Sequence, residues 1–197
     1  MNIFKKFKLW TNGMQQYFFK GNITIGKKVK FYQKLRLNGN GTIEIGDNSF
    51  FGYGIGGRFY GGSCEIQARS KDSVIKIGKN VAVNNNMFFC ANKSIVVEDD
   101  VLIGERVTIM DHNGHGVYPD RRRNSAGTAK EVIIKRNVWI GSNVTILPGT
   151  IIGDNSVVGA GSVVKGVFPD NVVIQGNPAV VVKKIKTENY QSLNRVV

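Results

Sequence analysis

The chain has 197 residues, the length of one domain with a sizeable core, so we expect a single domain. Lysine and arginine total 27 against 14 acidic residues, and the net charge of +13 favours phosphate-bearing ligands, anionic polymers or an acidic membrane surface without choosing among them. Two cysteines, Cys64 and Cys90, exclude a disulfide framework but leave one buried pair open. No stretch approaches the roughly 18 apolar residues of a spanning helix, so we expect a soluble, cytoplasmic protein.

Residues 1–20 scatter four lysines among apolar side chains and lack the continuous apolar run of a signal peptide. We expect this segment to be amphipathic and to cap the domain as a short helix. Phe4, Phe7 and Trp10, with lysines between them, make peripheral attachment to a membrane an alternative use of the same segment.

A repeat of six residues runs through the second half of the chain, in EVIIKRNVWIGSNVTILPGTIIGDNSVVGAGSVVKGV. An aliphatic residue recurs at every sixth position, and a small or β-branched residue follows the first five of these after four positions. The two series predict one inward face, made of Ile134, Ile140, Ile146, Ile152, Val158 and Val164 with Val138, Val144, Thr150, Ser156 and Ser162.

The first half keeps this period less strictly, with Ile-Gly pairs at Ile25, Ile45, Ile77 and Ile103 and with insertions at 37–44, 51–74 and 89–95. A six-residue period fits neither a 3.6-residue helix nor strands that end in hairpins. It favours short strands, tight corners and stacked coils, which is a parallel β-helix, over a sandwich with glycine turns. Glycine after the aliphatic residue suits a corner where φ can be positive and where no side chain should crowd the turn.

These repeats resemble the hexapeptide-repeat acyltransferases. The match is best in WIGSNVTILPGTIIGDNSVVGAGSVV and IQGNPAVVVKKI, which are similar to the maltose, galactoside and nodulation-sugar O-acetyltransferases and to relatives that acetylate capsular and lipopolysaccharide sugars. The resemblance implies an all-β fold, a left-handed parallel β-helix over residues 21–185 with short helical segments at its ends and a C-terminal tail at 186–197. It also implies a homotrimer with active sites between subunits.

The implied activity is acetyl transfer from acetyl-coenzyme A to a hydroxyl of a sugar or polysaccharide acceptor, in the synthesis of capsule, exopolysaccharide or lipopolysaccharide. No metal is expected. Transfer of the acetyl group to the nitrogen of an amino sugar or nucleotide sugar is the closest alternative, and a non-catalytic β-helix that only binds is the second.

The period is absent between Ile109 and Ile134, so residues 110–131 are expected to leave the coil as a loop. This loop, which begins DHNGHGVYPDRRR, holds both histidines of the chain. A hydroxyl that attacks a thioester must lose a proton, and histidine, with a reference pKa of about 6.5, suits that task near neutrality.

Matched backwards from VWIG without a gap, His115 falls on the family's catalytic histidine. His112 is the second candidate, because the polysaccharide-modifying relatives often carry Asp-His-x-His and the extra Gly114 leaves the register open. Asp111 either orients a histidine ring or caps a turn.

The donor site follows from the same resemblance. Trp139 comes one position after inward Val138 and therefore faces outward. Relatives use this tryptophan beside the thioester, contact the pantetheine arm at three small residues and place cations near the phosphates. The corresponding positions are Trp139, Ser142, Ala160, Gly161, Lys165 and Lys183. Relatives commonly carry threonine and arginine at the two lysine positions, so that part of the match is looser.

The acceptor site is assigned to Asn84, where the family contacts the sugar, and to Asn92, where relatives can carry aspartate. The insertion FFGYGIGGRFYGGS, residues 50–63, either walls an acceptor groove or packs on a neighbouring subunit. The arginine run 121–123 meets either an anionic ligand or solvent.

Two other classes of protein are disfavoured. A metal enzyme on this scaffold would need three histidine ligands, and the chain has two. Nucleic-acid binding would explain the charge, but the lysines are spread along the chain and no recognised motif is present, so no nucleic-acid partner is expected.

Overall fold

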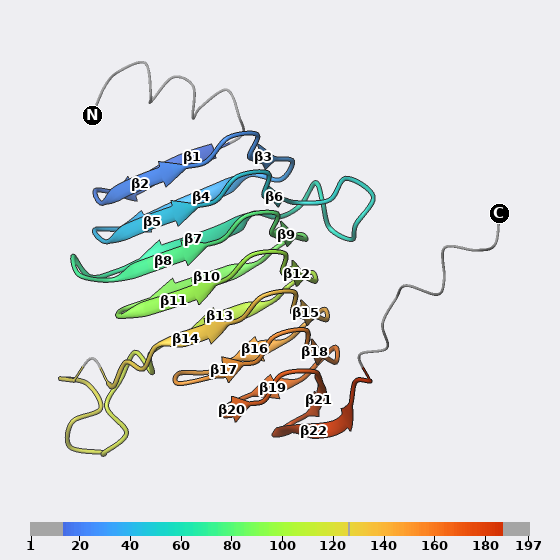
Figure 1. Ribbon diagram of the computed structural model, residues 1–197. Helices are drawn as coiled ribbons and strands as arrows, with labels where there is room; N and C mark the ends of the chain where they lie inside the picture. Colours follow the sequence, from blue (N-terminus) through green and yellow to red (C-terminus); the bar gives the residue numbers. More distant parts are fainter. Residues whose placement is uncertain (1–13, 126, 187–197) are drawn as a thin grey trace.

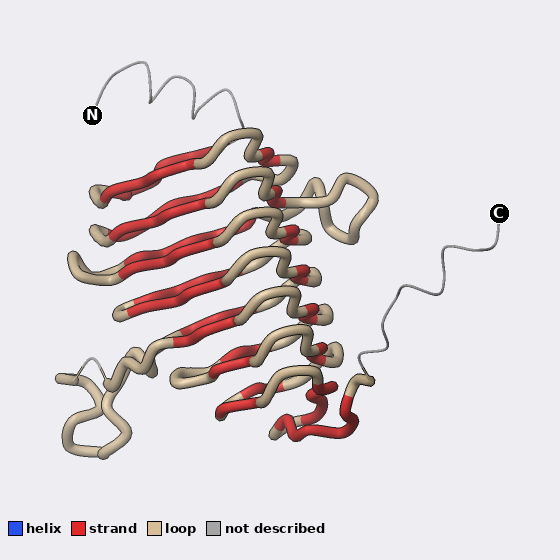
Figure 2. Tube along the Cα trace, in the orientation of Figure 1, coloured by secondary structure: helices blue, strands red, loops and turns tan. Residues whose placement is uncertain are grey.

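The computed structural model describes residues 14–125 and 127–186, and in that part the chain consists of strands, turns and loops (Figures 1 and 2). The strands form three sheets, each with one strand from every coil, and sheet C has β22 as an additional strand. Sheet A contains β1 (Met14–Phe19), β4 (Leu35–Gly39), β7 (Cys64–Ala68), β10 (Phe88–Ala91), β13 (Thr108–Met110), β16 (Thr145–Ile146) and β19 (Val163–Val164). Sheet B contains β2 (Asn22–Ile25), β5 (Thr42–Ile45), β8 (Val74–Ile77), β11 (Ser94–Val97), β14 (Val132–Ile134), β17 (Ile151–Ile152) and β20 (Val167–Phe168). Sheet C contains β3 (Lys30–Phe31), β6 (Phe50–Phe51), β9 (Ala82–Val83), β12 (Leu102–Ile103), β15 (Trp139–Ile140), β18 (Val157–Val158), β21 (Val172–Gly176) and β22 (Ala179–Lys184).

The chain visits sheets A, B and C in turn, and each strand pairs with the equivalent strand of the next coil (Figure 1). Among the strands of the three sheets, pairing is parallel except between β21 and β22, which is antiparallel. The predicted fold, a left-handed parallel β-helix, is confirmed.

The inward face predicted for the second half is confirmed, since all eleven side chains of the two series are at most 1% exposed. Polar members of the series bond to nearby carbonyls: Thr150 Oγ1 donates to Leu147 O at 2.7 Å and Ser162 Oγ donates to Gly159 O at 2.6 Å. The buried hydroxyl groups are therefore satisfied, as buried polar groups must be.

The glycines after the aliphatic residues avoid a steric clash between coils. A Cβ on Gly104 would lie 2.6 Å from Ser142 N, and one on Gly141 would lie 2.7 Å from Ala160 N. The expectation that these two glycines adopt positive φ is wrong. In the corner between sheets B and C, positive φ of 56° to 63° occurs three residues after the last inward residue of the strand, at Lys28, Asn48, Asn80, Asp100, Asn137, Asn155 and Asn171. Asparagine and aspartate tolerate this conformation better than most residues.

The three expected insertions have different structures. Those at 37–44 and 89–95 extend the strands of sheets A and B on either side of a turn, so the upper coils are wider than the lower ones (Figure 2). Within 51–74, residues 52–63 leave the coil as an arm beside sheet C, drawn in teal in Figure 1, and strand β7 follows.

The end segments differ from the expectation within the described residues, which contain no helix and therefore none that could span a membrane. Met14–Phe19 is strand β1 and pairs with β4, so the coil begins before residue 21. Near the other end, β22 turns back on β21. Phe4, Phe7, Trp10 and residues 187–197 lie outside the described residues.

Candidate active site

The predicted loop leaves the coil between β13 and β14, at the corner where sheet A meets sheet B (Figure 1). It spans residues 111–131, and its two ends meet: Lys130 N donates to Asp111 O at 2.7 Å, and His112 pairs with Ala129 in an antiparallel bridge. The extrusion is therefore closed at its base, and the coil continues below it in the same register.

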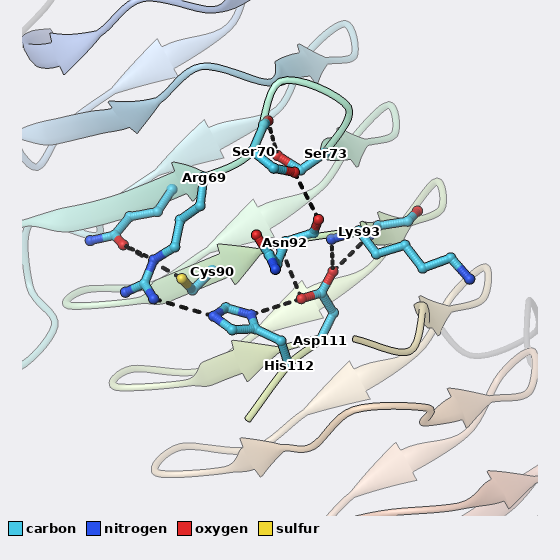
Figure 3. Close-up of polar contacts among 10 residues, drawn as sticks. Arg69, Ser70, Ser73, Cys90, Asn92, Lys93, Asp111 and His112 are labelled. Atoms are coloured by element: carbon cyan, nitrogen blue, oxygen red, sulfur yellow. Dashed lines mark hydrogen bonds and ion pairs between the residues drawn. The ribbon is translucent and has the colours of Figure 1, made fainter. Parts of the chain in front are cut away.

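The carboxylate of Asp111 is fully buried at this base (Figure 3). It accepts the main-chain N–H groups of Asn92, Lys93 and Ser94 at 2.8, 2.7 and 2.7 Å. It also accepts Nδ1 of His112 at 2.9 Å. Asp111 therefore both caps the turn of the coil above and orients a histidine ring, the two roles that the sequence left as alternatives.

The second ring nitrogen of His112 has a fixed partner as well. Nε2 lies 3.2 Å from Nη1 of Arg69 (Figure 3). A guanidinium group can only donate, so Nε2 accepts this hydrogen bond and Nδ1 carries the proton. The side chain is 5% exposed, and both of its nitrogens are occupied inside the protein.

His115 differs from His112 in exposure and in its free nitrogen. It lies in the exposed part of the loop, where its N–H donates to Asn113 O at 2.6 Å. Its Nδ1 lies 3.1 Å from the carbonyl oxygen of Arg122. Because a carbonyl can only accept, Nδ1 carries the proton, which leaves the lone pair on Nε2. Arg122 itself donates from Nη2 to Val117 O at 3.3 Å, which stabilises the turn that holds this carbonyl.

Trp139 lies on the outer face of sheet C, 54% exposed, as the alternation along the chain predicts. It borders a hollow of about 260 Å³ that Asn84, Leu102, Phe50 and Tyr53 also line. The structure therefore brings Trp139 together with Asn84, one of the two asparagines assigned to the acceptor.

The small residues assigned to the donor lie at the corner that follows sheet C, just after β15, which holds Trp139, and after β18, which pairs with it. Ser142 and Gly161 belong to successive coils, and Gly161 N donates to Ser142 O at 2.9 Å. Ala160 and Gly161 are exposed, and a Cβ on Gly161 would meet no atom within 4 Å. Open space along a backbone edge next to an exposed tryptophan fits a narrow, extended ligand.

The remaining candidates lie elsewhere. Lys165 is exposed at the corner between β19 and β20, below the loop, and Asn92 is at the same corner above it. Lys183 is exposed on β22 opposite Val173 of sheet C. Within one chain the candidates thus form two groups: the loop group at the corner of sheets A and B, and the Trp139 group along sheet C.

Both cysteines are free and buried, so the buried pair that the sequence left open does not form. Burial raises the pKa of the Cys64 thiol from 9.0 to about 11. Burial also raises the pKa of Cys90 to about 11, against an opposing effect of the nearby Arg69 charge. Neither thiol has the lowered pKa of a nucleophilic cysteine.

Two buried polar residues that the sequence analysis did not single out hold the arm 52–63. Gln33 Nε2 donates to Phe59 O at 3.1 Å. Asn85 Oδ1 accepts Tyr53 N at 2.9 Å, and its Nδ2 donates to Gly57 O at 3.0 Å. Both residues are buried in corners between strands, Gln33 two residues before Leu35 and Asn85 two residues after Val83, so they continue the inward alternation of those strands. A polar residue at such a position was the signal that could have identified them.

Comparison with known proteins gives consistent matches. Residues 131–166 match a family model described as bacterial transferase hexapeptide (six repeats). A protein of Escherichia coli K12 named for lipopolysaccharide biosynthesis O-acetyl transfer is 36% identical over 177 residues, which are 80% of this chain and 83% of that protein. The galactoside O-acetyltransferase of Lactococcus lactis IL1403 is 37% identical over 160 residues, 81% of this chain and 72% of that enzyme. Among solved structures, a galactoside acetyltransferase in complex with coenzyme A aligns with a TM-score of 0.55 and 26% identity over 94% of this chain and 72% of that one.

Proposed function

The chain belongs to the hexapeptide-repeat acyltransferase family, and we propose that it transfers the acetyl group of acetyl-coenzyme A to a hydroxyl group of a sugar. The observation that carries this proposal is the exposure and hydrogen bonding of the His115 imidazole, which lies on a loop whose two ends are joined at the coil. Its Nδ1 proton is engaged by Arg122 O, and its Nε2 lone pair is available.

In the proposed reaction, His115 Nε2 takes the proton of the acceptor hydroxyl as its oxygen bonds to the acetyl carbonyl carbon. The carbon–sulfur bond then breaks, and the imidazolium returns the proton to the departing thiolate. Arg122 O orients the ring and stabilises the charge that the imidazole gains, as the third member of a triad does. His112, whose two nitrogens already have partners, is proposed to position the loop together with Asp111.

Acetyl-coenzyme A is the proposed acetyl donor, and the Trp139 group fits it. The pantetheine arm would pass along the backbone of Ser142, Ala160 and Gly161, where no side chain obstructs it, and the ring of Trp139 would cover the thioester. Lys183 on sheet C, and Lys165 from the subunit that contributes the loop, are exposed cations that would meet the phosphates as point charges.

A complete site requires residues of two chains, because the loop group and the Trp139 group lie on different sides of one coil (Figure 1). We therefore propose a homotrimer in which the loop of one subunit faces sheet C of the next, and Asn84 and Asn92 contact the sugar from the two sides. A cytoplasmic location belongs to the same proposal and is supported by the two free thiols.

The acceptor is proposed to be a unit of a surface polysaccharide or glycolipid. The relative named for lipopolysaccharide biosynthesis, which aligns along most of both chains, supports this choice.

The test is release of free coenzyme A thiol from acetyl-coenzyme A with a panel of neutral, acidic and amino sugars. We expect sugar-dependent release in the wild type, a fall in kcat of about a hundredfold or more in His115→Ala, and less than about tenfold in His112→Ala. If only the amino sugars are acetylated, on nitrogen, the proposed transfer to a hydroxyl group is wrong and transfer to nitrogen takes its place. Equal losses in both variants would remove the assignment of the base to His115.

A further inference from the structure

A second hollow lies further up the outer face of sheet C, between the first coils and the arm 52–63. Its volume is about 660 Å³, and it is lined by Lys28, Lys30, Tyr32, Phe50, Tyr53 and Ile55 among others. No acidic residue lines it. Neither the reaction proposed above nor the residues assigned to it make use of this space.

The wall of this hollow is a built part of the structure. The arm that carries Tyr53 is fixed by Asn85, which is fully buried and bonds to the main chain of Tyr53 through both its Oδ1 and its Nδ2. Gln33, 2% exposed, holds the far side of the arm through Phe59 O. Buried side chains that bond to both ends of the arm keep its position defined.

The hollow continues to the Trp139 group, because Phe50 and Tyr53 line both hollows. A single outward column of residues forms the floor: Lys30 pairs with Phe50, Phe50 with Ala82, Ala82 with Leu102, and Leu102 with Trp139. Neighbouring strands are about 4.8 Å apart, so four steps separate Lys30 from Trp139 by about 19 Å. A monosaccharide is too short for this distance, whereas a chain of several sugars can span it.

The upper end of the groove is basic. Lys28 and Lys30 are both exposed, and Lys28 has φ of 56° at the corner where the other coils mostly carry asparagine. Neither lysine is in an ion pair among the described residues: Glu44 lies 3.7 Å from Lys76 Nζ, and Asp47 accepts the main-chain N–H of Lys27 at 2.6 Å. The two lysine charges are thus directed to a ligand or to solvent.

We propose that this groove binds an acidic oligosaccharide, so that the acceptor of the proposed reaction is a charged glycan of several units. The unit that is acetylated lies at Trp139, further units stack on the rings of Phe50 and Tyr53, and a carboxylate or phosphate on a distal unit pairs with Lys28 and Lys30. This inference rests on the proposed function, because it names the acceptor class of the same site.

The experiment uses the full-length protein and three sets of acceptors of matched length: neutral oligosaccharides, oligosaccharides with a uronic acid, and oligosaccharides with a phosphate. Rates of coenzyme A release are compared for the wild type, for Lys28→Gln/Lys30→Gln, and for Lys27→Gln/Lys79→Gln. The last variant loses the same charge from two exposed lysines that do not line the groove. Binding of each oligosaccharide without acetyl-coenzyme A is measured by calorimetry.

We expect the groove variant to raise KM for acidic acceptors roughly fivefold or more, with kcat and the KM for neutral acceptors unchanged and the control variant like the wild type. The set of acidic acceptors whose KM rises, uronic acid or phosphate, identifies the group that pairs with Lys28 and Lys30. Equal effects on neutral and acidic acceptors would overturn the proposal, as would an altered oligomeric state of the groove variant in sedimentation, which would make this face a subunit contact. If no acceptor supports coenzyme A release, the proposed function fails, and lysine-dependent binding in calorimetry decides separately whether the groove binds acidic glycans.

Discussion

Nη1 of Arg69 lies 3.2 Å from Nε2 of His112, so the one ring nitrogen of His112 that could take a proton already accepts a hydrogen bond. His115 has no such partner on Nε2 among the described residues. The two histidines of the loop thus differ in their partners: His112 contacts Arg69, 43 residues away in the chain, and His115 contacts Arg122, seven residues away.

The first prediction concerns Asp111. In Asp111→Asn one acceptor oxygen is replaced by an NH₂ group, which would face main-chain N–H groups of the turn at Asn92 to Ser94. We expect the free energy of unfolding to fall by about 2–4 kcal/mol in urea denaturation, because buried donors lose their acceptor. Glu131→Gln, at an exposed side chain that accepts Ser94 Oγ, serves as the control and should change stability by less than about 0.5 kcal/mol. A small effect of Asp111→Asn would mean that the turn forms without the carboxylate.

The second prediction concerns the corner glycines. Gly141→Ala would place a Cβ 2.7 Å from Ala160 N, and the next coil must move to make room. We expect a loss of stability of about 2 kcal/mol or more, measured as a lower Tm and midpoint in urea. Gly54→Ala, on the arm with no atom within 4 Å of the added carbon, should be neutral. Similar Tm values for both variants would contradict the steric reason given for the corner glycines.

The third prediction concerns the pH dependence of stability. Both cysteines have a pKa raised to about 11 in the folded state against 9.0 ordinarily. Below pH 9 both states hold these protons, so the contribution is complete there. Between pH 9 and pH 11 the unfolded chain releases them first, and the free energy of unfolding falls. Urea denaturation at pH 8 and pH 10.5 should show a larger decrease for the wild type than for Cys64→Ala/Cys90→Ala.

The same burial predicts slow reaction of the folded protein with thiol reagents at pH 8. Cys64 is fully buried and Cys90 is 1% exposed, so labelling should require unfolding. Rapid labelling of either thiol without denaturant would contradict the packing of sheet A.

The fourth prediction is that Trp139 contributes to activity and not to the stability of the fold. More than half of its surface is exposed, so Trp139→Ala should leave Tm nearly unchanged. Loss of the proposed cover over the thioester should raise KM for acetyl-coenzyme A and lower kcat/KM about tenfold or more. Leu102→Ala, the outward residue one coil above, is the matched substitution on the same column and should affect donor binding less.

Much of the fold could be predicted because the six-residue period fixes which side chains face inward. Each period supplies one strand to one sheet, and three periods complete a coil, so the topology follows from the repeat. The interrupted period located the insertions, but the structure that each insertion forms could not be predicted in this way. Extra residues at 89–95 lengthen β10 and β11, whereas those at 52–63 form an arm, and the difference depends on Gln33 and Asn85, which bind that arm from other coils.

The candidate site was predictable to the level of the loop and the outward tryptophan. The resemblance placed His115 ahead of His112, but the difference between their surroundings was not predictable, because it depends on Arg69 for one ring and on the carbonyl of Arg122 for the other. Period and spacing carry no information about such partners, which only the folded chain brings within hydrogen-bonding distance. The sequence did not single out Lys28 and Lys30 for the same reason, since only the folded chain shows that these two lysines line a hollow.

The closed base of the loop has a consequence for how this scaffold can change. Asp111 O and Lys130 N join the two ends of the excursion at 2.7 Å, and the strands on either side keep the register of the coil. The residues between these ends can thus be replaced as a unit. Their length and composition can vary while the stacked coils below and above keep their contacts, so new chemistry can be installed at this corner without redesign of the core.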